Sequence, residues 1–127
     1  MRRVLKTRPF CRWMRKTELT DQSLCAAVAE MTQGLLDGNL GGNVFKKRVG
    51  VANKGKRSSV RTIIATNHGS KWFFVFGFEK NDRSNISKHE LEVLQELAKD
   101  LLGISQAQVD QAIAKRTLEE ICHGPQS

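Results

Sequence analysis

The sequence contains no tyrosine among its 127 residues. A phenol is therefore excluded as the proton donor of any reaction that the chain performs. The sequence also lacks any stretch approaching the roughly 20 apolar residues that a membrane-spanning helix requires. Its basic N-terminus is not followed by an apolar segment and a small-residue cleavage site, so no secretion signal is expected.

Cysteine is scarce as well. The three cysteines, Cys11, Cys25 and Cys122, are widely spaced, and no pair has the spacing of metal ligands. This pattern favours reduced thiols and predicts a cytoplasmic location. No His or Asn lies in an obvious supporting position, so a catalytic cysteine is not expected.

Positive charge is abundant and concentrated in the middle of the chain. The whole protein has 21 Lys and Arg against 13 acids, which gives a net charge of +8. Between Val44 and Arg83 the only acids are Glu79 and Asp82, whereas the bases are Lys46, Lys47, Arg48, Lys54, Lys56, Arg57, Arg61, Lys71, Lys80 and Arg83. Ten bases against two acids carry the same net charge as the entire protein. Such a concentration implies an anionic partner, of which a polyphosphate chain is the commonest.

The N-terminal part predicts a strand over 1–6 and two helices. The first helix covers 10–16, with Phe10, Trp13 and Met14 on one side. The second helix is capped by Thr20 or Asp21 and carries apolar residues at helical spacing as far as Leu35. The two helices are expected to form a hairpin that covers one face of a sheet.

Three antiparallel strands are predicted next, over 44–51, 59–66 and 71–78. In the first strand, Phe45, Val49 and Val51 alternate with Lys46 and Arg48, and Lys47 is an exception among the inward positions. A Gly- and Lys-containing loop, 52–58, joins the first two strands, and 67–70 forms a hairpin turn. The third strand is apolar on both faces, which predicts a central place in the sheet.

The C-terminal part predicts two helices, each beginning at a capping box. Ser87 with Glu90 marks the first start, and Ser105 with Gln108 marks the second. Gly103 ends the first helix, and the tail after Ile121 is expected to be loose. The chain is thus a single α+β domain over 1–127.

This order of elements, with bases on the three-strand meander, resembles the RelE/ParE superfamily of bacterial toxins from toxin–antitoxin modules, and its HigB-like RelE branch in particular. The residues that carry the resemblance are the runs 45–49, 54–57, 61–64 and 76–86. The resemblance implies a RelE-like fold and an endoribonuclease that cuts messenger RNA, typically in the ribosomal A site. It further implies a cognate antitoxin, often of helix-turn-helix type, and a reaction that needs neither metal nor cofactor.

In such toxins the ribose 2′-hydroxyl attacks the neighbouring phosphodiester, and basic side chains serve as base, phosphate clamp and acid. By resemblance, Lys46 is the preferred base, Arg48 its partner, Arg61 the phosphate clamp and Lys80 the transition-state cation or acid. The side chains expected to bind flanking RNA are Lys47, Lys54, Lys56, Arg57, Asn81 and Arg83.

Three residues depart from the family pattern. RelE has an arginine where this chain has Asn81 and a tyrosine near the position of Ser87, and the HigB-like branch often has an aromatic residue at the position of Val60. The identity of the general acid is therefore open. Two alternatives remain: a nucleic-acid-binding module without catalysis, and a ParE-like toxin that inhibits gyrase.

The remaining aromatic and histidine residues are expected to be mainly structural. Trp72, Phe74 and Phe76 are predicted to share one strand face in the core rather than to stack on bases. His68 is expected to be structural in its turn. His89, in the first turn of a capped helix, and His123, in the tail, are weaker candidates for substrate contact.

Overall fold

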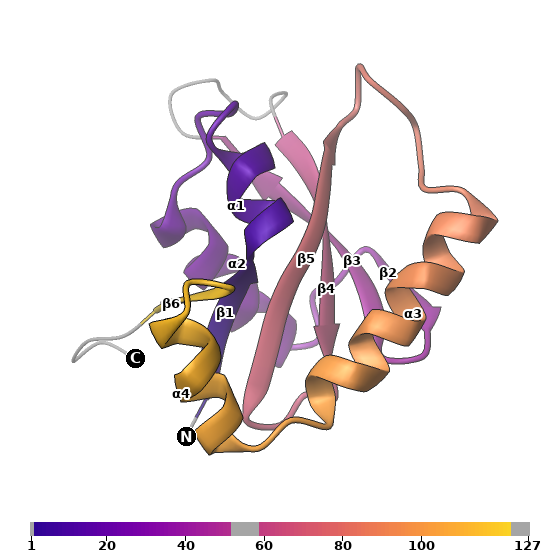
Figure 1. Ribbon diagram of the computed structural model, residues 1–127. Coiled ribbons are helices and arrows are strands. Elements are labelled where there is room, and N and C mark those ends of the chain that lie inside the picture. Colours follow the sequence, from indigo (N-terminus) through magenta and orange to yellow (C-terminus); the bar gives the residue numbers. More distant parts are fainter. Residues whose placement is uncertain (1, 52–58, 123–127) are drawn as a thin grey trace.

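The computed structural model of the protein describes residues 2–51 and 59–122. In these ranges six strands form one mixed sheet, with helices on both of its faces (Figure 1). The elements in chain order are β1 (Arg3–Thr7), α1 (Arg8–Met14), α2 (Asp21–Thr32), β2 (Gly38–Gly41), β3 (Val44–Gly50), β4 (Ser59–Thr66), β5 (Lys71–Glu79), α3 (Lys88–Leu102), α4 (Gln106–Ala114) and β6 (Leu118–Ile121). The predicted α+β class is confirmed.

The sheet has the strand order β2-β3-β4-β5-β1-β6. Strands β3, β4 and β5 form the predicted antiparallel meander, and β1 pairs in parallel with β5. The apolar strand β5 therefore lies inside the sheet, between β4 and β1, as its composition predicted. Strands β2 and β6 were not predicted. Each has only four residues, and β6 depends on pairing with β1 at the opposite end of the chain.

Two hydrophobic cores lie on opposite faces of the sheet. Helices α1 and α2 cover one face, where the largest buried side chains are Phe10, Leu24, Met31, Trp72 and Phe74. Helices α3 and α4 cover the other, where Leu5, Ile63, Phe73, Leu94 and Val109 are buried. Figure 1 shows α1 and α2 on one side of the strands and α3 on the other. In α3 the buried residues are Leu94 and Ala98, and Leu91 near the start of the helix is partly buried against the same core.

The helix starts follow the capping residues that the sequence contains. The Thr20 hydroxyl accepts a hydrogen bond from the Ser23 N–H at 3.1 Å. Ser87 and Glu90 form both bonds of a capping box, at 3.1 and 2.7 Å, and Ser105 with Gln108 does the same for α4. These predicted boundaries are confirmed because capping depends on residues within one turn of each other.

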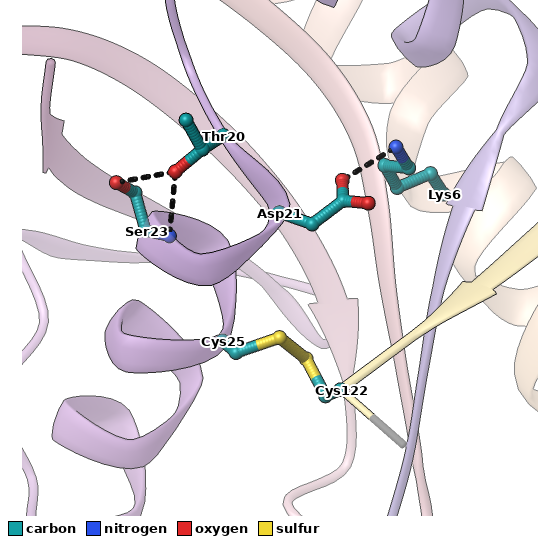
Figure 2. The surroundings of a disulfide bond; sticks show 6 residues. All are labelled: Lys6, Thr20, Asp21, Ser23, Cys25 and Cys122. Atoms are coloured by element: carbon teal, nitrogen blue, oxygen red, sulfur yellow. Dashed lines mark hydrogen bonds and ion pairs between the residues drawn. A yellow bond between two sulfur atoms is a disulfide. The ribbon is translucent and has the colours of Figure 1, made fainter. Parts of the chain in front are cut away.

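The expectation that all three cysteines are reduced is wrong for two of them. Cys25 of α2 and Cys122, directly after β6, form a disulfide across a sequence separation of 97 residues (Figure 2). Spacing along the chain could not reveal this pair, because the unpredicted strand β6 brings Cys122 to α2. Cys11 remains a free thiol, and burial raises its pKa.

A buried lysine joins the same elements. Lys6 of β1 is only 5% exposed and pairs with Asp21 at 2.7 Å, which Figure 2 shows, and with Glu119 at 3.2 Å. Burial disfavours its charged form, but the hydrogen bonds and attraction from the two carboxylates outweigh burial, so its pKa is raised. Over the part of the chain that the structure describes, no helix is both long and apolar enough to cross a bilayer.

Candidate functional site

Three of the four expected catalytic cations lie together on the face of the sheet that α3 covers only in part. Arg48 of β3 is directly opposite Arg61 of β4 in the antiparallel register. Lys46, two residues before Arg48 on β3, points to the same face because strand side chains alternate. Directly opposed side chains have their Cβ atoms about 4.5–5.5 Å apart. The side chains of Arg48 and Arg61 therefore start from neighbouring positions, with Lys46 on the same face.

Within residues 2–51 and 59–122, few acidic groups lie close to Arg48 and Arg61. The Arg48 side chain is 61% exposed, and its Nε lies 4.0 Å from Asp37 Oδ1, at the outer limit of an ion pair. The Asp37 carboxylate instead accepts a hydrogen bond from the Arg48 main-chain N–H at 2.6 Å. Arg61 is half-buried and donates from Nη1 to the Ser59 hydroxyl at 3.2 Å. Like charges on neighbouring strands repel, so an anion bound between them would relieve the repulsion.

The third strand of the meander contributes aromatic rings to the same face. Residues that pair across the three strands form two rows. One row contains Lys46, Ile63 and Phe76, and the other contains Arg48, Arg61 and Phe78. The site therefore consists of two rows of side chains that run across β3, β4 and β5. We call it the basic face and define it by Lys46, Arg48, Arg61, Phe76 and Phe78.

Arg83 reaches the basic face from the connection between β5 and α3. Its guanidinium carbon lies 5.6 Å from the centre of the Phe76 ring, within the range of a cation–π contact. Its Nη1 lies 2.5 Å from Glu90 Oε1. Hydrogen bonds from Ser87 and from Arg83 lower the pKa of Glu90, so this carboxylate stays charged and holds Arg83 in place.

Lys80 and Asn81 follow β5 directly, in a tight turn closed by a 3.0 Å hydrogen bond from the Asp82 N–H to the Glu79 carbonyl. Both side chains are exposed. They stand at the end of the strand that carries Phe76 and Phe78, next to the basic face.

Lys47 lies on the opposite face of the sheet. It is 7% exposed, and its ammonium pairs with Glu30 of α2 at 2.7 Å. The alternation of β3 had placed Lys47 among the inward-facing residues, and its charge there is paired with the Glu30 carboxylate. The geometry does not support the expectation that Lys47 binds RNA, because α2 covers it. Lys54, Lys56 and Arg57 lie outside the described residues, as do His123 and the tail beyond 122.

The prediction that Trp72, Phe74 and Phe76 share one face is wrong for Phe76. The pairing of β4 with β5 shifts register between Ile63 and Ile64, opposite the stretch from Phe74 to Phe76. This irregularity reverses the alternation, so Trp72 and Phe74 pack under α1 and α2 while Phe76 emerges on the basic face. Sequence reasoning missed Phe76 as a site residue because alternation alone cannot show a bulge.

The two described histidines differ in environment. His68 has a positive φ of 63° in its turn, and its ring packs edge-on against Phe45 and Trp72 at 4.8 and 5.3 Å. This confirms a structural role. His89 is exposed at the start of α3. Among the described residues, no group of three or more His, Cys, Asp or Glu side chains is arranged to hold a metal ion.

Comparison with known proteins identifies a family that the chain matches. A family model described as the RelE toxin of the RelE / RelB toxin–antitoxin system matches residues 2–121. A search of the curated proteins found no match. The matched range takes in both halves of the sheet and all of the basic face.

Proposed function

The chain belongs to the RelE toxin family of toxin–antitoxin systems, and from this premise we propose that it is an endoribonuclease that cuts messenger RNA and so stops translation. The observation that supports the proposal is the basic face: Lys46, Arg48 and Arg61 lie in register on one side of the meander, and Arg48 is exposed with only a 4.0 Å contact to Asp37 among the described residues. A ParE-like inhibitor that acts only by binding would not need cations gathered around one point.

The proposed reaction is transfer of the phosphodiester to the neighbouring 2′-hydroxyl. Lys46, in its neutral amine form, takes the proton of the attacking 2′-hydroxyl and becomes an ammonium, and the 2′-oxygen forms a bond to phosphorus. Arg48 and Arg61 bind the non-bridging oxygens, where negative charge develops, and their planar forks suit two oxygens at once. The bond from phosphorus to the 5′-oxygen breaks, and Lys80 at the end of β5 supplies the proton to that oxygen. The products are a 2′,3′-cyclic phosphate and a free 5′-hydroxyl.

The family match also implies a protein partner. A toxin of this family pairs with a cognate antitoxin. We propose that the antitoxin is a helix-turn-helix protein and that the message is cut at the ribosomal A site. Both follow from the resemblance of the meander residues to the HigB-like branch.

Induced expression of the chain should arrest growth and leave messages with new 5′ ends that carry hydroxyl groups. Primer extension on total RNA would map these ends. Comparing purified message with message in a translating extract would show whether cleavage needs the ribosome. Arrested cells with intact messages would contradict the nuclease and favour the gyrase alternative.

The two neighbouring lysines of β3 should behave differently because they face opposite sides of the sheet. Lys46→Met is expected to weaken RNA binding and to reduce its salt dependence by about one phosphate contact. Lys47→Met should change neither, since Lys47 is covered by α2 and paired with Glu30. RNA affinity measured over a salt series checks this pair. Equal losses in the two variants would contradict the assignment of faces.

A further inference from the structure

A cavity borders the basic face. It has a volume of about 320 Å³ and lies between α1 and the C-terminal half of β5. Its walls include Trp13, Phe76, Gly77, Phe78, Asp82 and Arg83. We call it the β5 pocket. Its size is at the lower end of the range for ligand sites, which suits one small planar group better than a long chain.

The pocket exists because β1 is shorter than β5. Strand β1 pairs with β5 only as far as Lys6 opposite Phe74, and the chain then turns into α1 at Arg8. Among the described residues, no strand pairs with 75–79 on that side. The main-chain N–H and C=O groups of this edge therefore remain open to hydrogen bonds, as at any strand edge.

Trp13 of α1 shapes the wall above this edge. A Cβ atom built on Gly77 would lie 2.2 Å from Cζ3 of Trp13, so the indole rests directly on the glycine backbone. The sequence had suggested that Gly77 lets a ligand approach the main chain, but Trp13 takes the space over it. An aromatic ring and an open strand edge are thus fixed next to each other.

These groups match the chemistry of a nucleobase. A base offers a flat π face, which stacks on aromatic rings and on guanidinium planes, and a polar edge of donors and acceptors. The pocket offers the partly exposed rings of Trp13 and Phe76, whereas Phe78 is only 3% exposed and has no free face for stacking. Arg83 lies over the Phe76 ring and is held there by Glu90. The open edge of β5 and the Asp82 carboxylate supply hydrogen-bonding partners.

The position of the pocket links it to the basic face. Phe78 is the cross-strand partner of Arg61, and neighbouring strands are about 4.8 Å apart. A phosphate between Arg48 on β3 and Arg61 on β4 would therefore lie about 7 Å, or one and a half strand spacings, from β5, and the pocket lies at the far edge of that strand. We propose that the β5 pocket binds one base of the RNA, next to the phosphate that the arginines hold. This inference rests on the proposed function, because it assumes that the anion on the basic face is RNA.

The test compares RNA with and without bases. The full chain is titrated at low salt with a 2′-O-methyl hexanucleotide, which cannot be cut, and with a base-free hexamer of the same sugar–phosphate backbone. Because stacking of a base on aromatic side chains is a strong, sequence-tolerant contact, removal of the bases is expected to weaken binding about tenfold or more. In Phe76→Leu this difference should largely disappear, because leucine has no π face on which a base can stack.

Two controls keep the test decisive. Arg83→Gln should reduce the preference for bases, whereas Arg116→Gln, the same change at an exposed position after α4, should not. If Phe76→Leu fails to fold, tryptophan emission of the unaltered protein gives an independent readout. Trp13 lines the pocket and Trp72 is 1% exposed, so the hexanucleotide should quench emission and the base-free hexamer should not.

Each outcome decides between the two proposals. Equal binding of the two hexamers overturns the base pocket and leaves the nuclease standing. A preference for bases that survives Phe76→Leu, without quenching, also overturns the pocket because the bases are then bound elsewhere. If neither hexamer binds and messages stay intact in expressing cells, the proposed function itself is overturned. If binding requires the bases and quenches tryptophan emission, and the preference for bases is lost in Phe76→Leu, both the base pocket and the nuclease are supported.

Discussion

Lys46→Ala should lower the rate of RNA cleavage by about 10²–10⁴-fold, and Arg61→Ala should lower it by about 10²–10³-fold. The first loss corresponds to a missing general base. The second corresponds to a missing donor at oxygens that gain charge in the transition state. The two changes should not add fully, because both residues act on one phosphate. Either variant is expected to relieve growth arrest.

The control variants must separate catalysis from general loss of positive charge. Lys115→Ala makes the same chemical change as Lys46→Ala at an exposed position at the end of α4, and it should leave cleavage unchanged. Arg61→Lys keeps the charge but loses the planar fork, so it should recover only part of the rate. Rates would be read from single-turnover cleavage of a message and RNA affinity from separate binding curves. A fall in affinity in proportion to the rate would indicate a simple binder, and unchanged toxicity would contradict the site.

Reduction of the Cys25–Cys122 disulfide should lower the free energy of unfolding by about 2–4 kcal/mol. The bond spans 97 residues, so it restricts a large part of the unfolded chain. In the folded protein it ties α2 to the end of β6, an edge strand whose only partner among the described residues is β1. Neither cysteine lies on the basic face, so RNA affinity should not change.

Urea unfolding of the Cys11→Ser variant, with and without a thiol reductant, would measure this difference. That variant keeps Cys25 and Cys122 as its only cysteines. The double change Cys25→Ser with Cys122→Ser should match the reduced protein and should no longer respond to reductant. Equal midpoints with and without reductant would show that the bond contributes nothing. In a reducing compartment the bond would be open and the lower stability would apply.

Much of the fold could be predicted because its causes are local. The capping boxes at Ser87 and Ser105 marked the starts of α3 and α4. Alternation along β3 placed Lys46 and Arg48 on one face and Phe45 and Val49 on the other. The apolar character of β5 placed that strand inside the sheet.

The predictions that failed concern features that depend on contacts between distant parts of the chain. Strands β2 and β6 are too short to be recognised by themselves, and β6 forms only against β1, more than a hundred residues away in the chain. The disulfide depends on that pairing and was missed with it. Phe76 was assigned to the wrong face because a register shift against β4 is a property of two strands together.

The amino-acid sequence by itself determined which residues could carry the chemistry. Ten cations between Val44 and Arg83, the absence of tyrosine and a meander with alternating faces are properties of composition and local pattern. Only the tertiary structure decided which cations lie on the same face of the sheet. Pairing of β3 with β4 sets Arg48 opposite Arg61, α2 covers Lys47, and the early end of β1 leaves the β5 edge open beside Trp13. The physical reason is that a side chain's character is set by its own atoms, whereas its neighbours are set by strand register and by the helices packed on the sheet.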